Sequence, residues 1–173
     1  MDSFLKGACV LYIVAIGLSG WSLIKPNWVV TEKGDLSLGL LVHCEKIHGR
    51  PMLCMMPNGP VEWLLAACLI GIGILALTVG IAMIFMSDKR PKLRRYPKYL
   101  GLFAWFLFCV AIVIFPAGFD LPLIGGQSYL LPSSAKTGMS YVLFFMGILC
   151  TVGGAALALG RMYFAMIVWR GHA

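Results

Sequence analysis

The stretch "WLLAACLIGIGILALTVGIAMIFM" (residues 63–86) contains no charged residue. A helix that crosses the hydrocarbon core of a bilayer needs about 20 predominantly apolar residues, so this run is long enough to span a membrane. Three further uncharged runs lie at residues 7–24, 99–119 and 139–160. The sequence therefore predicts a mainly α-helical membrane protein, with four spans packed as a bundle in a single domain (1–173).

The composition supports a membrane protein and argues against a soluble domain. The 173 residues are 60% hydrophobic and 12% charged, and the mean hydropathy is +0.89. A soluble domain carries roughly twice that charged fraction. We expect membrane lipid to surround the spans, and we expect no nucleic-acid partner.

Basic residues indicate how the chain is oriented in the membrane. The connector 87–98, "SDKRPKLRRYPK", holds six of the 14 Lys and Arg residues. Positively charged short loops stay on the cytoplasmic side, so this connector and both termini are predicted to be cytoplasmic. The connectors 25–62 and 120–138 are then extracellular. We expect the span 7–24 to be a retained signal anchor, and its cleavage would leave the sidedness of the other loops unchanged.

The basic connector 87–98 has two interpretations. Clustered Lys and Arg beside a membrane attract anionic lipid headgroups, by roughly 1 kcal/mol per residue. Alternatively, the charges only fix the topology. For so short a connector, tethered at both ends, the sequence favours the second interpretation.

Two cysteines stand apart from the other four. Cys44 and Cys54 are the only cysteines in the two connectors predicted to be extracellular. An oxidising compartment favours a disulfide between them, worth roughly 3 kcal/mol by the chain-entropy estimate. A zinc site would recruit His43 and His48 as well, but this spacing does not match the usual paired-ligand patterns. No Cys-x-x-Cys redox motif is present, so we expect no metal and no cofactor.

The first extracellular connector predicts a small β-sheet. The runs "NWVVTE" (27–32) and "LSLGLLVHC" (36–44) favour strands, and "KGD" between them favours a turn, so a hairpin is expected. The alternative is an irregular loop tied by one disulfide. In the other connector, Ser128–Leu131 is predicted to add an edge strand that ends at Pro132.

The predicted spans contain none of the residues that chemistry inside a membrane requires. No Asp, Glu, His, Lys or Arg lies in residues 7–24, 63–86, 99–119 or 139–160. Proton relays and intramembrane hydrolases depend on such ionisable groups. We therefore predict no catalytic residues and no enzymatic activity.

Small residues recur at helix-packing spacing in the fourth span. Gly154 with Ala158, and Ala156 with Gly160, are each four positions apart. This spacing lets helix backbones approach closely, either within the bundle or at a dimer face. We favour packing within the bundle.

Five residues of the first extracellular connector resemble the claudin-superfamily signature. The matching residues are Trp28, Gly39, Leu40, Cys44 and Cys54. Leu41 stands where that signature has a second tryptophan, which argues against a true claudin. The resemblance implies a claudin-like four-helix transmembrane bundle with a small extracellular β-sheet.

Longer motifs are similar to those of the modulator of Smoothened family, claudin-like four-span proteins that attenuate Hedgehog signalling. They are "GLLVHCEKIHGRPMLC" (39–54), "EW" (62–63), "LFCVAIVIFPAGF" (107–119), "GGQSYLLP" (125–132) and "SYVLF" (140–144). The resemblance implies a non-enzymatic membrane adaptor that acts with a single-pass EGF-repeat receptor and its RING-type ubiquitin ligase. Together they would lower Smoothened, the indirect target, at the plasma membrane and primary cilium.

Within these motifs, the candidate partner-contact residues are Ile47, His48, Gly49 and Arg50. The simpler interpretation is that they only shape the disulfide loop. Two other functions are compatible with a claudin-like fold: a cell-junction protein, or an auxiliary subunit of a membrane channel or receptor. A fold alone does not separate these functions.

Overall fold

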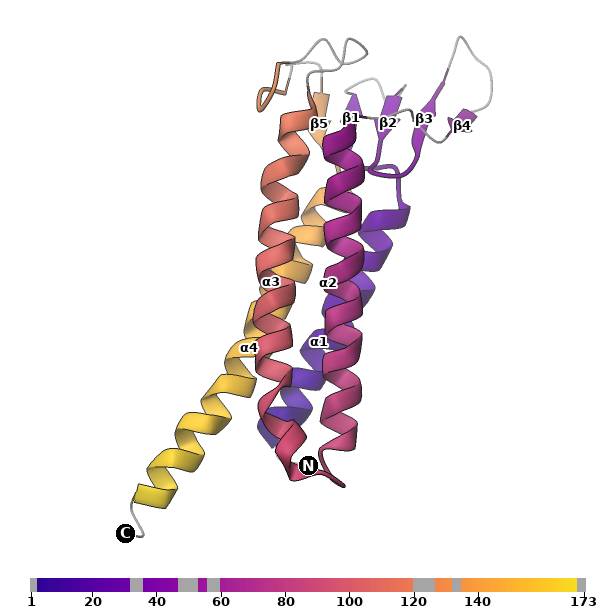
Figure 1. The fold of residues 1–173 in the computed structure, drawn as a ribbon. Helices are drawn as coiled ribbons and strands as arrows, with labels where there is room; N and C mark the ends of the chain where they lie inside the picture. Colours follow the sequence, from indigo (N-terminus) through magenta and orange to yellow (C-terminus); the bar gives the residue numbers. More distant parts are fainter. Residues whose placement is uncertain are drawn as a thin grey trace.

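Four long helices form the body of the molecule (Figure 1). The computed structural model describes residues 3–31, 36–46, 53–55, 60–119, 127–131 and 135–170, with side chains of the last helix described through residue 160. The helices are α1 (Ser3–Ile24), α2 (Val61–Met86), α3 (Pro97–Ile114) and α4 (Met139–Arg170). Two short 3₁₀ helices, η1 (Pro91–Arg95) and η2 (Phe115–Phe119), flank α3.

Each long helix includes a segment that is long and apolar enough to cross a membrane, with η1 and η2 extending the third. In a bilayer a helix satisfies its backbone hydrogen bonds internally, which is why uncharged runs of this length become helices. The predicted four-span, mainly helical fold is therefore confirmed. The first three segments begin a few residues earlier than predicted, so Lys6, Glu62 and Lys98 lie in the first turns of α1, α2 and α3.

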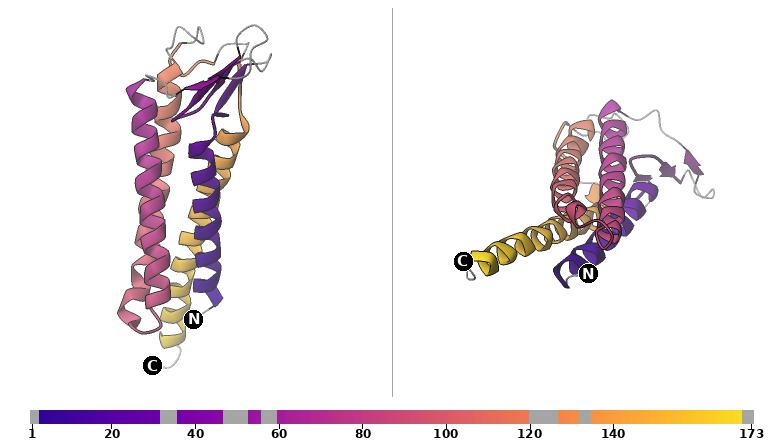
Figure 2. Two further views of the ribbon diagram at one scale, coloured as in Figure 1. Left: turned by 90° about the vertical axis from the view of Figure 1, so that its right-hand side faces the viewer. Right: turned by 60° about the horizontal axis from the view of Figure 1, so that its bottom comes forward.

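The helices pack as two tight pairs. α1 packs chiefly against α4, and α2 packs chiefly against α3. The two pairs lie side by side, with the start of α1 and the end of α4 at the same end of the molecule (Figures 1 and 2). The last turns of α4 project away from the other helices (Figure 1).

A five-stranded antiparallel sheet covers the opposite end of the bundle (Figures 1 and 2). Its strands are β1 (Val29–Thr31), β2 (Leu36–Leu38), β3 (His43–Glu45), β4 (Leu53–Met55) and β5 (Ala135–Thr137), in the order β4-β3-β2-β1-β5. β1 pairs with β2 with Val29 opposite Leu38. The hairpin predicted between the first two β-prone runs is thus confirmed.

Two strand predictions were wrong. Residues 36–44 do not form one strand: the Gly39 N–H donates to the Val42 carbonyl at 3.0 Å, and this turn divides the run into β2 and β3. Ser128–Leu131 does not form an edge strand either. Gln127 and Leu130 close a tight turn with Tyr129 at φ 64°, and the edge strand of that connector is β5. Sequence preference at 128–131 was outweighed by this turn, because a left-handed residue ends an extended run.

The core between the helices is aromatic toward the sheet end. Trp28, Trp63, Phe108, Phe115 and Phe144 are fully buried there. Phe115 lies within ring-contact distance of both tryptophans, at 4.8 Å from Trp28 and 5.5 Å from Trp63. This cluster joins the start of the sheet to three of the helices.

Candidate partner-binding surface

The sheet is anchored to the bundle by hydrogen bonds around residues 22–28. The Ser140 and Gly138 N–H groups donate to the carbonyls of Asn27 and Trp28, at 3.0 and 2.8 Å. The Ser22 hydroxyl donates to the Ser140 carbonyl at 2.8 Å. These bonds join the end of α1 to the beginning of α4, so the helix pair holds the strands in position.

Trp28 is a structural residue, not a contact residue. Its side chain is fully buried, and its indole N–H donates to the Ser22 carbonyl at 2.8 Å. Its ring packs on Phe115 and, at 5.4 Å, on Phe144. A buried tryptophan needs a partner for its N–H, and the end of α1 supplies it.

Gly39 and Leu40 also shape the sheet from within. A Cβ atom at Gly39 would lie 2.6 Å from the Cα atom of Pro26 and 2.8 Å from the Val42 carbonyl oxygen. Only glycine allows this close backbone approach. Leu40, the next residue of this turn, has its side chain buried in the core. Leu41 stands at the position of the second signature tryptophan, and its side chain is exposed.

The predicted disulfide between Cys44 and Cys54 is present. The sulfur atoms are 2.03 Å apart. β3 and β4 pair with Cys44 directly opposite Cys54, and the Cα atoms are 4.0 Å apart. Because both sulfur atoms are used in this bond, neither cysteine is available as a thiolate ligand, and the zinc interpretation loses half of its ligands.

One face of the sheet changes from buried to exposed along its width. Side chains alternate between the two faces of a strand, and the pairing places Leu38, His43 and Met55 in one cross-strand row. Leu38 is buried, whereas Met55 in the edge strand is 53% exposed and its strand neighbour Leu53 is 48% exposed. This face therefore runs from a buried leucine in β2, across His43 in β3, to exposed apolar side chains in the edge strand β4.

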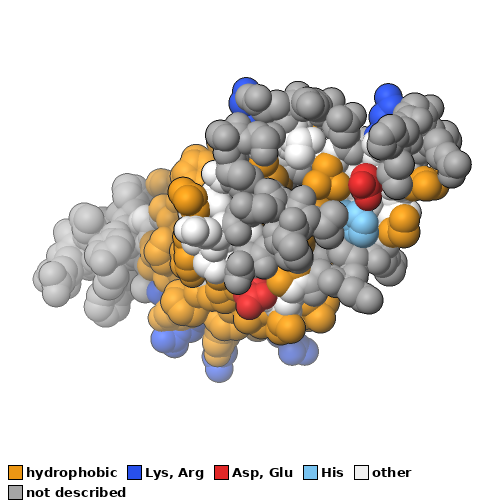
Figure 3. All heavy atoms as spheres, turned by 90° about the horizontal axis from the view of Figure 1, so that it is seen from above, with side chains coloured by type: hydrophobic (Ala, Val, Ile, Leu, Met, Phe, Trp, Pro, Cys, Tyr) orange, Lys and Arg blue, Asp and Glu red, His pale blue; other side chains and the backbone are white. Residues whose placement is uncertain are grey.

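We call Leu41, Leu53 and Met55 the β4 surface. Leu41 lies in the turn between β2 and β3, at the same end of the strands as Met55. Glu45 lies opposite Leu53 in the pairing, so a carboxylate borders the apolar side chains. Figure 3, seen from the sheet end, shows acidic, histidine and hydrophobic side chains adjoining there. Exposed apolar side chains with a polar border are typical of a protein-binding surface.

The candidate contact residues Ile47, His48, Gly49 and Arg50 lie outside the described residues. They belong to the segment that connects β3 to β4, whose two strands the disulfide ties together. Among the residues that the structure describes, no three His, Cys, Asp or Glu side chains gather where they could hold a metal ion.

The structure separates the two small-residue pairs of α4. Gly154 and Ala158 are buried, and a Cβ atom at Gly154 would lie 2.6 Å from the Tyr12 ring. Ala156 is exposed, and apart from the helix's own backbone no atom of the described side chains and elements lies within 4 Å of a Cβ atom built at Gly160. The two pairs therefore face different surroundings.

Sequence reasoning missed the β4 surface and the position of Tyr12. β4 is only three residues long, and nothing in "LCM" separates it from a loop. The predicted disulfide was the available clue, because it brings the residues around Cys54 beside those around Cys44. If both segments are strands, Leu53 and Met55 lie together on the face opposite to the Cys54 side chain.

A comparison with protein-family models finds a match over residues 25–162, to the family described as Attenuator of Hedgehog. The match covers both connectors at the sheet end and the second, third and fourth predicted spans, and it begins just after the first span. It includes the residues that build the sheet, the disulfide and the β4 surface.

Proposed function

This chain belongs to the Attenuator of Hedgehog family, and we propose that it acts as a non-enzymatic adaptor in the plasma membrane. It would work with a single-pass EGF-repeat receptor and its RING-type ubiquitin ligase to lower Smoothened at the cell surface and primary cilium. The family is one of signalling modulators that attenuate the Hedgehog pathway. The named partners and the target come from the resemblance to the modulator of Smoothened family.

The observation that carries the proposal is the β4 surface. Leu53 and Met55 are half exposed in a strand that the disulfide links to β3, and the Trp28 cluster packs the other side of the sheet, at the start of β1, on the bundle. A pre-organised surface binds a partner without the cost of ordering itself. The segment 47–50 adjoins this surface in the chain and supplies the further contact residues Ile47, His48, Gly49 and Arg50.

The orientation that we propose places the sheet outside the cell. The basic connector 87–98 and both termini are then cytoplasmic by the positive-inside rule. In this orientation the β4 surface faces a partner ectodomain, and the apolar faces of the helices face lipid or a partner's single span. Packing between spans of different proteins relies on close contact between small residues, which the exposed Ala156 and the open position Gly160 provide.

Proximity labelling in Hedgehog-responsive cells tests the proposal. A labelling enzyme is fused to the chain, and surface Smoothened is measured in the same cells with and without the chain. We expect the EGF-repeat receptor and its ligase among the labelled proteins, and less surface Smoothened when the chain is present. Recovery of tight-junction scaffolds or channel subunits without receptor or ligase would reject the proposal in favour of the junction or auxiliary-subunit functions.

A further inference from the structure

The connector between α2 and α3 is a folded turn, not a loose loop. Ser87 is buried, and its hydroxyl donates to the Ile84 carbonyl at 2.6 Å, so it closes the end of α2. The Arg90 N–H donates a hydrogen bond to the Met86 carbonyl at 3.1 Å. The Leu93 N–H then donates to the Arg90 carbonyl at 3.0 Å within η1. The backbone of the connector is therefore fixed by its own hydrogen bonds.

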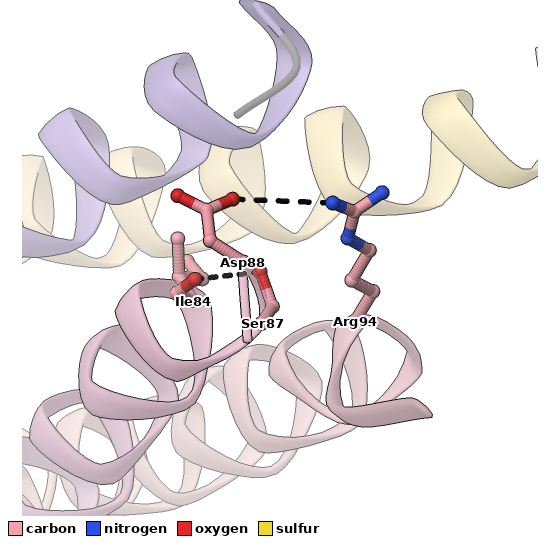
Figure 4. A network of polar contacts seen from close by, with 4 residues as sticks. All are labelled: Ile84, Ser87, Asp88 and Arg94. Atoms are coloured by element: carbon pink, nitrogen blue, oxygen red, sulfur yellow. Dashed lines mark hydrogen bonds and ion pairs between the residues drawn. The ribbon is translucent and has the colours of Figure 1, made fainter. Parts of the chain in front are cut away.

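Four basic side chains project from this turn. Lys89, Arg90, Lys92 and Arg95 are all exposed. The connector contains one acidic residue, Asp88, and its carboxylate lies 3.9 Å from the Arg94 guanidinium. Figure 4 shows the Asp88 and Arg94 side chains reaching toward each other across the turn. This ion pair lies at the surface, since the Arg94 side chain is 32% exposed and the Asp88 side chain 52% exposed, and the other four cations are exposed as well.

Exposed aromatic and apolar side chains flank the turn on the helices. Tyr96 and Tyr99 are exposed at the start of α3. Phe85 and Met86 are exposed at the end of α2. Aromatic residues of this kind lie at the headgroup level of a bilayer, so they place the four cations at the depth of lipid phosphates.

We propose that this turn is a binding site for the headgroup of a polyanionic lipid, one that carries phosphate monoesters on an inositol ring. Several cations held in a fixed turn match several phosphates on one ring better than they match a single phosphodiester. The orientation of a membrane protein depends on how many Lys and Arg residues a loop contains. A loop that only sets the orientation therefore does not need to hold these residues in a fixed turn. The structure thus favours lipid binding, which the sequence alone did not. In the proposed orientation the turn faces the leaflet in which anionic lipids are concentrated.

The test uses the full chain in nanodiscs of phosphatidylcholine that contain a fluorescent phosphatidylinositol bisphosphate. Binding is measured as energy transfer from the protein to the lipid. We expect unlabelled phosphatidylinositol bisphosphate to displace the probe at a concentration at least about tenfold below that of phosphatidylserine. Equal displacement by the two lipids would overturn the proposal, because it would show attraction by net charge alone.

A matched pair of variants locates the site. Lys89→Gln, Arg90→Gln and Lys92→Gln together remove three charges from the turn. Lys25→Gln, Lys46→Gln and Lys136→Gln together remove three exposed charges from the sheet end. We expect roughly 100-fold weaker lipid binding for the first variant, at about 1 kcal/mol for each charge removed, and unchanged binding for the second. Equal effects of the two variants would reject the site.

Soluble inositol trisphosphate distinguishes a lipid site from a site for free phosphates. We expect it to compete much more weakly than the lipid, because only the lipid also contacts the aromatic and apolar side chains beside the turn. Competition as strong as that of the lipid would contradict a lipid site. None of these results depends on Smoothened or on the proposed partners, so failure here leaves the proposed function to its own test.

Discussion

At the scale of single residues, Tyr12 shows why particular glycines are required inside the bundle. Its side chain is fully buried, and its hydroxyl donates to the Pro97 carbonyl at 3.2 Å. A Cβ atom at Gly101 or Gly154 would clash with its ring or hydroxyl. One tyrosine of α1 therefore fills the space that two glycines leave on α3 and α4.

Replacing Gly154 by alanine tests this packing. We expect the free energy of unfolding to fall by about 1–3 kcal/mol, the usual cost of overfilling a packed core. Gly160→Ala in the same helix is the control, because among the described residues its new Cβ atom meets nothing within 4 Å beyond the helix's own backbone. Thermal unfolding in detergent should show a lower midpoint for Gly154→Ala and an unchanged or slightly higher midpoint for Gly160→Ala. Equal shifts would mean that Tyr12 does not restrict this position.

Replacing Trp28 by alanine tests the anchor of the sheet. The change removes a fully buried ring and the hydrogen bond to Ser22, so we expect a loss of about 3–5 kcal/mol in the free energy of unfolding. Trp21→Ala removes a tryptophan that is mostly exposed and should cost far less. Chemical denaturation of both variants in detergent measures the difference. Similar losses would show that the Trp28 cluster does not hold the sheet on the bundle.

At the scale of elements, the helices could be predicted from the sequence and half of the sheet could not. Long uncharged runs have one stable structure in lipid, so the four spans followed directly. β1 and β2 were expected from β-branched and apolar residues around a turn. β5 was not, because Ala135–Thr137 has no β-prone pattern and pairs with β1 more than a hundred residues earlier. Such a strand exists only because α4 begins beside the end of α1.

The disulfide between β3 and β4 was predicted from the sequence, and in the structure its two cysteines lie directly opposite each other in the paired strands. Cys44→Ser with Cys54→Ser should lower the free energy of unfolding by about 3 kcal/mol, because the unfolded chain is no longer cross-linked. Thermal unfolding of the variant and the parent chain measures this loss. Peptide mass spectrometry of the unreduced protein should recover a Cys44–Cys54 cross-linked peptide. Free thiols at both positions would contradict the pairing.

At the scale of the whole molecule, the structure has two ends with different chemistry. The sheet, the disulfide and the β4 surface form one end (Figure 1). The basic turn lies at the other end, together with the start of α1 and the end of α4 (Figures 1 and 2). The uncharged spans between them have the length of a bilayer core. The chain is thus built to present different surfaces on the two sides of a membrane.

Epitope tags test which side each end faces. A tag at either terminus should bind antibody only after the plasma membrane is permeabilised. A tag inserted in residues 120–126 should bind antibody on intact cells, because that connector lies at the sheet end. Staining of a terminal tag on intact cells would reverse the proposed orientation and move the β4 surface to the cytoplasm.

The β4 surface is the central claim, and a Hedgehog reporter assay tests it most directly. Cells that lack this chain receive the parent chain, Leu53→Glu with Met55→Glu, or Leu130→Glu, an exposed residue of the other connector at the same end. Expression is matched by the amount at the cell surface. We predict that the parent chain and Leu130→Glu lower the reporter signal, and that the double variant does not. Full attenuation by the double variant would contradict the claim that this surface carries the function.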